Sequence, residues 1–119
     1  MLNWKQLHSF KDFENFMGDK NWKTIYSYLA FGYDCLEDCY YVKYHNTRIV
    51  TFYRNGNVTI NNGGYLTKTT KKYINMFAYD YIYIKQKKCV WYGFINTDKI
   101  EKDGIKLIVG DDITCTQSI

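Results

Sequence analysis

Two β-rich runs flank an Asn-Gly pair in the middle of the chain. Residues 47–53 are rich in β-branched and aromatic side chains, and residues 57–61 alternate, with Val58 and Ile60 on one face. The dipeptide at residues 55–56 is typical of a two-residue hairpin turn in which both central residues take positive φ. The sequence therefore predicts a β-hairpin that any fold of this chain has to contain.

Other runs rich in Tyr, Ile and Val indicate further strands. Residues 34–38 hold three acidic side chains and are typical of a turn, whereas residues 22–33 favour a strand, with a short helix as the alternative. The remaining predicted strands are residues 40–44, 81–85, 89–95 and 105–109.

Apolar side chains near the start of the chain recur at steps of three and four, the period of an amphipathic helix. Gly18 ends this pattern, so we expect one helix over residues 1–18. Its apolar stripe consists of Trp4, Leu7, Phe10, Phe13, Phe16 and Met17.

A second, short helix is predicted near residues 69–79. Thr69 or Thr70 would be its N-cap, because a threonine hydroxyl can accept a hydrogen bond from the first turn. Its apolar face would carry Tyr73, Ile74 and Phe77.

These elements predict an α+β fold with a mostly antiparallel sheet. A hydrophobic content of 46% and an aromatic content of 19% exclude intrinsic disorder, and 119 residues suit one domain over residues 1–119. The chain has no apolar run long enough to span a membrane and no signal-peptide core, so we expect a cytoplasmic protein without a membrane partner. The expected order is a helix at 1–18, strands at 22–66, a helix at 67–79 and strands at 80–110.

The net charge of +4 is concentrated in residues 67–90, which hold six lysines and a single acid, Asp80. Such a stretch attracts a nucleic-acid backbone or an acidic protein surface. The alternative is a solvated lysine face that keeps the protein soluble. The lysines are Lys68, Lys71, Lys72, Lys85, Lys87 and Lys88.

A glycine pair precedes the second predicted helix. Glycines let backbone N–H groups approach a ligand closely, and a helix start directs further N–H groups at an anion. This segment could hold a phosphate, although its spacing is not that of a P-loop, and the alternative is a turn followed by a helix cap. The candidate residues are Gly63, Gly64, Tyr65, Thr69, Thr70 and Tyr73.

Aromatic side chains are interleaved with these lysines. They would form a stacking platform for bases or anchors for a protein partner, including a second copy of the chain, and the alternative is a place in the core. The set comprises Tyr53, Tyr65, Tyr73, Tyr79, Tyr81, Tyr83, Trp91 and Tyr92.

Catalytic and metal-binding patterns are weak in this sequence. Two histidines are present, and a Cys39–His45 nucleophilic pair is a minor alternative. The four cysteines, at positions 35, 39, 89 and 115, form one loose pair and two singletons, which favours reduced thiols over a zinc site. We therefore expect a non-enzymatic protein without a metal or cofactor.

The middle of the chain carries a distinctive motif, which reads His45-Asn46-Thr47-x-Ile49-Val50, then Gly63-Gly64-Tyr65-x-Thr67-x-Thr69-Thr70-Lys71, then Ile74-Asn75. With this motif, roughly residues 40–110 resemble a family of small bacteriophage proteins. The resemblance implies a viral origin and a compact β-rich domain, and it supplies no catalytic residue. Tyr73 stands where a basic residue is common, which counts against phosphate binding at the helix start.

Three functions are consistent with these features. The first is a phage inhibitor of host defence, similar in action to an anti-CRISPR protein, that binds a host effector protein such as a defence nuclease. The second is a nucleic-acid-binding accessory protein of phage replication or expression. The third is a pocket that captures a nucleotide signal. A homodimer would suit the same aromatic surface as a host partner.

Overall fold

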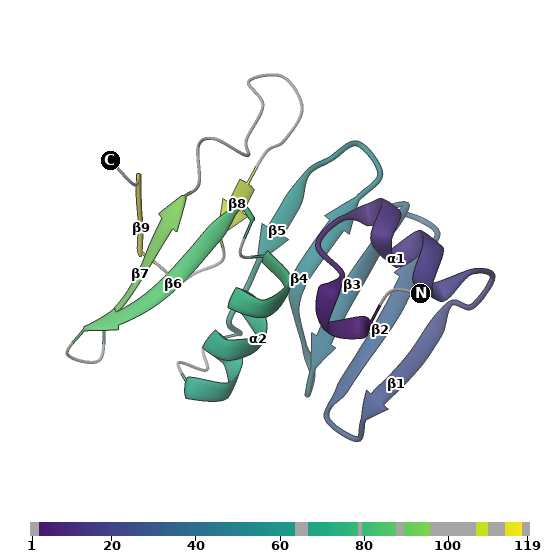
Figure 1. Cartoon of the computed structure of the whole chain (residues 1–119), viewed down its shortest axis with the longest axis horizontal. Helices are drawn as coiled ribbons and strands as arrows, with labels where there is room; N and C mark the ends of the chain where they lie inside the picture. The colour runs from purple at the N-terminus through teal and green to yellow at the C-terminus, as the bar shows by residue number, and fades with distance from the viewer. Residues whose placement is uncertain are drawn as a thin grey trace.

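The structure of the protein is a computed structural model, which describes residues 3–63, 67–78, 80–87, 90–95, 107–109 and 114–117. These residues form two β-sheets, with two α-helices packed beside them (Figure 1). The α+β fold, with an N-terminal helix and mostly antiparallel sheets, is confirmed.

The larger sheet contains the predicted hairpin. Its first five strands follow one another as antiparallel neighbours, and its last strand joins the edge in parallel. In spatial order the strands are β1 (Trp22–Tyr26), β2 (Leu29–Asp34), β3 (Cys39–Tyr44), β4 (Thr47–Tyr53), β5 (Val58–Ile60) and β8 (Leu107–Val109).

The smaller sheet is built from the second half of the chain. Its first two strands form an antiparallel pair, and the third lies parallel to the second. The strands are β6 (Ile82–Lys87), β7 (Val90–Ile95) and β9 (Thr114–Gln117).

Three helical segments accompany the sheets: the 3₁₀ turn η1 (Trp4–Gln6), the helix α1 (Phe10–Met17) and the helix α2 (Lys68–Ala78). Figure 1 shows α2 between the two sheets, with α1 over β1–β3. No helix in the described part of the chain is long and apolar enough to cross a membrane.

Aromatic rings from both helices and from the larger sheet meet in one core. The ring of Phe13 on α1 lies 5.1 Å from that of Phe31 on β2, 5.2 Å from Phe52 on β4 and 6.2 Å from Phe77 on α2, centroid to centroid. All four side chains are buried, so the core holds α1 and α2 on the same face of the sheet.

The predicted N-terminal helix proves to be two segments. Ser9 caps α1 by accepting a hydrogen bond from the backbone N–H of Asp12, and the helix therefore begins at Phe10 rather than at the start of the chain. It ends at Gly18, as expected, where φ is +60°. Trp4 of η1 packs partly buried against the core, and Leu7 between the two segments is fully buried.

Two other boundaries differ from the expectation. Residues 22–33 form two strands joined by a turn at residues 27–28, because β1 folds back onto β2. The N-cap of α2 is Thr67, whose Oγ1 accepts from the N–H of Thr70, and not Thr69 or Thr70.

The predicted hairpin forms, with Val58 and Ile60 both buried, but its turn is of a different type. Gly56 has φ +93°, whereas Asn55 is not in the positive-φ region. The N–H of Gly56 donates to the carbonyl of Tyr53, and Tyr53 in turn donates to Asn57. This is a three-residue loop with a glycine bulge, which needs one left-handed residue instead of two.

Candidate functional site

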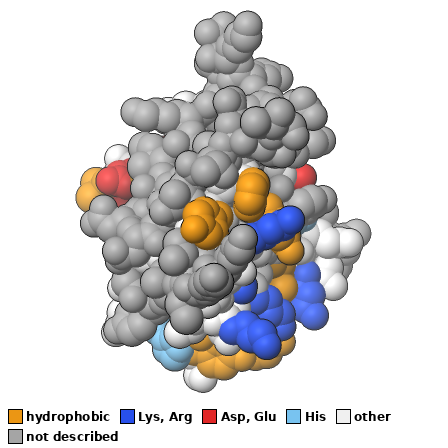
Figure 2. Space-filling model, turned by 90° about the vertical axis from the view of Figure 1, so that its left-hand side faces the viewer, with side chains coloured by type: hydrophobic (Ala, Val, Ile, Leu, Met, Phe, Trp, Pro, Cys, Tyr) orange, Lys and Arg blue, Asp and Glu red, His pale blue; other side chains and the backbone are white. Residues whose placement is uncertain are grey.

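Lysine side chains gather where α2 lies beside β6. Lys68 and Lys72 on α2 and Lys85 on β6 are exposed, and Lys71 is half-buried. We call these four residues the lysine surface. Figure 2 shows Lys and Arg side chains clustered on the side of the molecule that is at the left of Figure 1, where these elements lie.

The lysines of this surface form no ion pair with an acidic side chain among the described residues. All ion pairs found among the described residues belong to Arg48 or Arg54, and none belongs to one of these lysines. The Nζ of Lys71 donates to Oε1 of Gln86 on β6 at 3.3 Å, which is a neutral partner. The first turn of α2 contains no acidic residue, so its helix dipole and its lysines present positive charge together.

A cavity of about 360 Å³ lies beside the start of α2. The β3–β4 turn forms one wall, and His45 in this turn has φ +54°. Its lining residues are Tyr44, His45, Asn46, Thr47, Ile49, Asn62, Thr67 and Thr70.

Some polar groups at or next to this cavity are paired with near neighbours in the sequence. The N–H of Gly63 donates to Oδ1 of Asn61 at 2.7 Å, and the hydroxyls of Thr67 and Thr70 lie 2.9 Å apart. Gly63 therefore does not offer its N–H to a phosphate, contrary to the role predicted for it. The φ of +62° at this position and its closeness to the side chain of Thr47 explain why glycine occupies it.

Three tyrosines lie next to the β3–β4 turn. The rings of Tyr26 and Tyr28 stack at 5.5 Å, and Tyr28 meets Tyr44 edge-on at 6.0 Å. We call Tyr26, Tyr28 and Tyr44 the tyrosine row. Tyr73 on α2 lies beneath it, 5.4 Å from Tyr44, where burial and then a hydrogen bond with Tyr28 raise its pKa to about 12.

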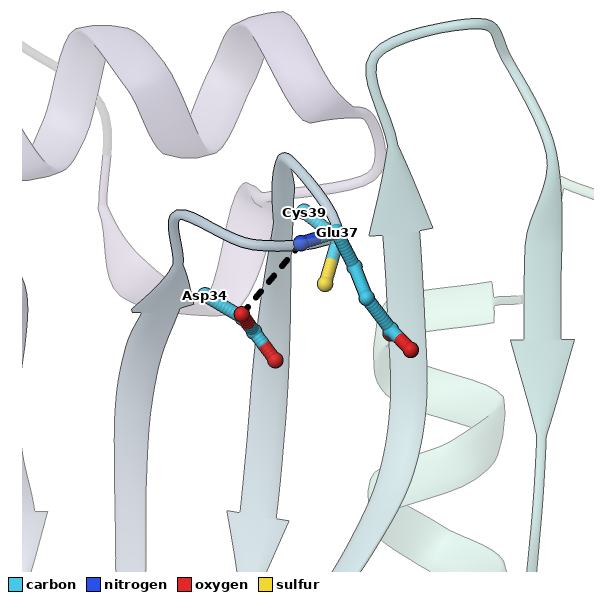
Figure 3. A group of neighbouring side chains, drawn as sticks. All are labelled: Asp34, Glu37 and Cys39. Carbon is cyan, nitrogen blue, oxygen red and sulfur yellow. Dashed lines mark hydrogen bonds between the residues drawn. The ribbon is translucent and has the colours of Figure 1, made fainter.

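Asp34, Glu37 and Cys39 bring two carboxylates and a thiol within 4.8 Å of one another (Figure 3). Asp34 uses Oδ1 to accept from the backbone N–H groups of Leu36 and Glu37, and Oδ2 to accept from Nη1 of Arg48 at 3.2 Å. Burial, followed by the charges of Asp34 and Glu37, raises the pKa of the Cys39 thiol to about 11. The Asp34 carboxylate closes a turn and binds Arg48, which gives it a structural role.

The structure also tests the other predictions that involve the cysteines. Cys35 is exposed and Cys39 is buried, and both are free thiols. Cys39 and His45 stand at opposite ends of β3, roughly 15–20 Å apart along the strand, so the suggested nucleophilic pair does not form. Cys89 and the side chain of Cys115 lie outside the described residues.

Three predicted contact residues are buried. Thr70 and Trp91 keep 1% of their surface exposed and Tyr73 keeps 6%, and both aromatic side chains belong to the hydrophobic core. These three side chains are therefore not part of the exposed surface. Thr69 is exposed. The predictions for Gly64, Tyr65, Lys88 and the side chain of Lys87 lie outside the described residues.

The tyrosine row was missed because its members belong to separate predicted segments. Tyr26 and Tyr28 fall in the run that favoured a strand, and the aromatic residues considered from the sequence began at Tyr53. A turn assigned at residues 27–28 would have placed both rings at a hairpin end.

Comparison with known proteins identifies the group to which this sequence is related. The model of the Kyanoviridae Gp96 protein family matches residues 9–111. The chain belongs to the Kyanoviridae Gp96 protein family. The Kyanoviridae are phages, so the expected phage origin of the family is confirmed. Searches of curated proteins and of solved structures found no match to this Gp96 family member.

Proposed function

We propose that this phage protein acts by binding rather than by catalysis, and that its lysine surface contacts the phosphates of a nucleic acid in the host cytoplasm. The observation that carries the proposal is the cluster of Lys68, Lys71, Lys72 and Lys85, which has no acidic partner among the described residues. A cluster of cations without counter-charges is stabilised when a polyanion covers it.

The spacing of the lysines on α2 supports this reading. Lys68, Lys71 and Lys72 stand at steps of three and four, so they share one face of the helix. Phosphates bound there would also interact favourably with the positive end of the α2 dipole. The contacts are to the backbone of the nucleic acid and carry no sequence preference.

Fluorescence anisotropy with labelled single-stranded DNA, duplex DNA and RNA tests the proposal, at salt concentrations of about 50 and 200 mM. Replacing Lys68 and Lys72 together by Glu should weaken binding and lower the slope of log affinity against log salt by about two. Lys11→Glu with Lys20→Glu is the matched control, since these exposed lysines lie on or after α1 and change the net charge equally. Absence of binding at low salt, or equal loss in both double variants, would exclude the proposal.

A second candidate function is inhibition of a host defence effector protein. The tyrosine row favours it, because Tyr26 and Tyr28 are 45% and 38% exposed and lie stacked at the end of a hairpin. Tyrosine is enriched at protein interfaces, where its ring gives apolar contact and its hydroxyl a hydrogen bond.

This candidate is tested with a purified host defence nuclease as the partner. The protein should form a complex with the nuclease and reduce its DNA cleavage, and replacing Tyr26 and Tyr28 together by Ala should abolish both effects. Tyr83→Ala, a similarly exposed tyrosine on β6, should leave them unchanged. Full inhibition by the Tyr26/Tyr28 double variant would exclude the tyrosine row as the docking site.

A further inference from the structure

One row of side chains crosses the larger sheet on the face turned away from the helices. Trp22 pairs with Gly32, Gly32 with Tyr41, and Tyr41 with Thr51 in the register of β1–β4. Phe31, next to Gly32, contacts both α1 and α2 through its ring. Because neighbouring residues of a strand point to opposite faces, this row lies on the face opposite to both helices.

Gly32 lies at the centre of this row, where its lack of a side chain leaves room for the ring of Tyr41. A side chain at this position would collide with the end of the Tyr41 ring, which lies over it. Trp22 approaches from the other side, with its ring 6.5 Å from that of Tyr41, and 48% of Trp22 remains exposed. Two aromatic side chains thus meet over a glycine, and the indole keeps a free surface.

A cationic side chain lies over each of these two rings. The guanidinium carbon of Arg48 lies 3.9 Å from the ring centroid of Tyr41, and Nζ of Lys43 lies 5.8 Å from the ring of Trp22. Asp34 accepts from Nη1 of Arg48, which holds the guanidinium at Tyr41, and no hydrogen bond from its other donors is found among the described residues.

We propose that this face of the larger sheet binds single-stranded nucleic acid, with one base stacked on Trp22 and a second on the guanidinium plane of Arg48. Lys43 and Arg48 stand where the phosphates between stacked bases would need counter-charges. This inference rests on the proposed function, because it states which form of nucleic acid the protein takes.

Single strands fit these residues better than a duplex does. Aromatic rings and guanidinium planes stack on bases whose faces are free, and a duplex keeps those faces inside its own stack. A protein partner is the other occupant that the aromatic residues would suit, but it would have to bury Lys43 and Arg48, for which the described residues show a single ion pair, that of Arg48 with Asp34.

Tryptophan fluorescence reports on this site directly, because Trp22 is exposed whereas Trp4 is half-buried and Trp91 is buried. The probes are an oligothymidine of about 12 nucleotides and a duplex of the same length. The single strand should quench the fluorescence of the unmodified protein, and Trp22→Ala should remove the quenching and weaken single-strand binding about tenfold. Duplex binding should stay unchanged.

Two controls separate stacking from folding and from charge. Tyr83→Ala removes a similarly exposed aromatic ring on β6, in the other sheet, and it should not alter the quenching of Trp22 by the single strand. Trp22→Phe keeps an aromatic face and should retain most of the affinity.

The outcomes distinguish this inference from the proposed function. If the lysine-surface variant loses binding while Trp22→Ala binds and is quenched like the unmodified protein, this inference is wrong and the proposed function stands. If the unmodified protein binds no nucleic acid at low salt, both are wrong. Equal affinity for duplex and single strand, with no quenching, would also overturn this inference.

Discussion

The side-chain amide of Asn75 on α2 pairs with both backbone polar atoms of Ile84 on β6. Nδ2 of Asn75 donates to the Ile84 carbonyl at 2.9 Å, and the N–H of Ile84 donates to Oδ1 of Asn75 at 2.6 Å. The side chain of Asn75 thus satisfies the two backbone groups that a neighbouring strand would otherwise bond at this edge strand. The same pair of hydrogen bonds attaches the smaller sheet to α2. The lysine surface depends on this attachment, because Lys85 directly follows Ile84.

Asn75→Ala should therefore destabilise the protein by about 2 kcal/mol, since two hydrogen bonds are lost and the buried Ile84 keeps unpaired backbone groups. Urea unfolding measures this loss. Asn75→Asp retains the acceptor but would set a carboxylate oxygen against the Ile84 carbonyl oxygen, so its destabilisation should be at least as large. A midpoint for Asn75→Ala equal to that of the unmodified protein would show that the pair contributes nothing to stability.

Gly63→Ala should also destabilise the protein, for two separable reasons. A φ of +62° is unfavourable for alanine by about 1 kcal/mol, and the new methyl group would contact the side chain of Thr47, whose Cγ2 would lie 2.9 Å away. In a Thr47→Ala background the penalty should fall to the backbone contribution alone. A double-mutant cycle from urea unfolding measures the difference, and perfect additivity would argue against the contact.

Asp38 should make stability depend on pH in the acid range. A hydrogen bond from Arg54, followed by one from Tyr33, lowers the pKa of this carboxyl below its ordinary value of 3.8. Its contribution is therefore fully present above that value and is lost as the pH falls through the lowered pKa. Asp38→Asn should flatten the fall in unfolding free energy between about pH 5 and pH 2, measured by urea unfolding.

Asp19→Asn serves as the control for this pH dependence. Asp19 is exposed and has no ion pair among the described contacts, so its replacement should leave the acid slope as it is in the unmodified protein. An Asp38→Asn protein with an unchanged slope would mean that other carboxyls cause the acid sensitivity.

The two described cysteines should differ sharply in reactivity. Cys35 is exposed, whereas burial raises the pKa of the Cys39 thiol to about 11, so little of it is thiolate at pH 8. Iodoacetamide labelling of the native protein, read by peptide mass spectrometry, should modify Cys35 and spare Cys39. Labelling in urea should modify both, and equal native labelling of the two would contradict the burial of Cys39.

Local patterns predicted much of the fold. The alternation of Val58 and Ile60 follows from the two-residue period of a strand, and both prove to be buried. The stripe that includes Phe13 was recognised because a helix repeats every 3.6 residues, although a cap at Ser9 shortened the helix. Element boundaries were less accurate, because caps and turns depend on single hydrogen bonds.

The candidate site was predicted only in part. Lys68, Lys72 and Lys85 are exposed as expected, since lysine ammonium groups stay in water. Tyr73 and Trp91 were placed on the same surface, but aromatic side chains suit a core as well as an interface, and periodicity alone does not distinguish the two. The parallel pairings of β8 and β9 had no local signal either, because they join strands far apart in the chain.

The amino-acid sequence by itself determined the α+β composition, the hairpin and the concentration of lysines, because hydrophobic period, turn chemistry and charge are properties of neighbouring residues. Tertiary structure decided which side chains from separate strands and helices meet. Trp22, Gly32 and Tyr41 form one row because β1, β2 and β3 pair in a particular register, and Asn75 reaches Ile84 because α2 packs beside β6. Such neighbours are selected by the free energy of packing the whole core, which no short stretch of sequence contains.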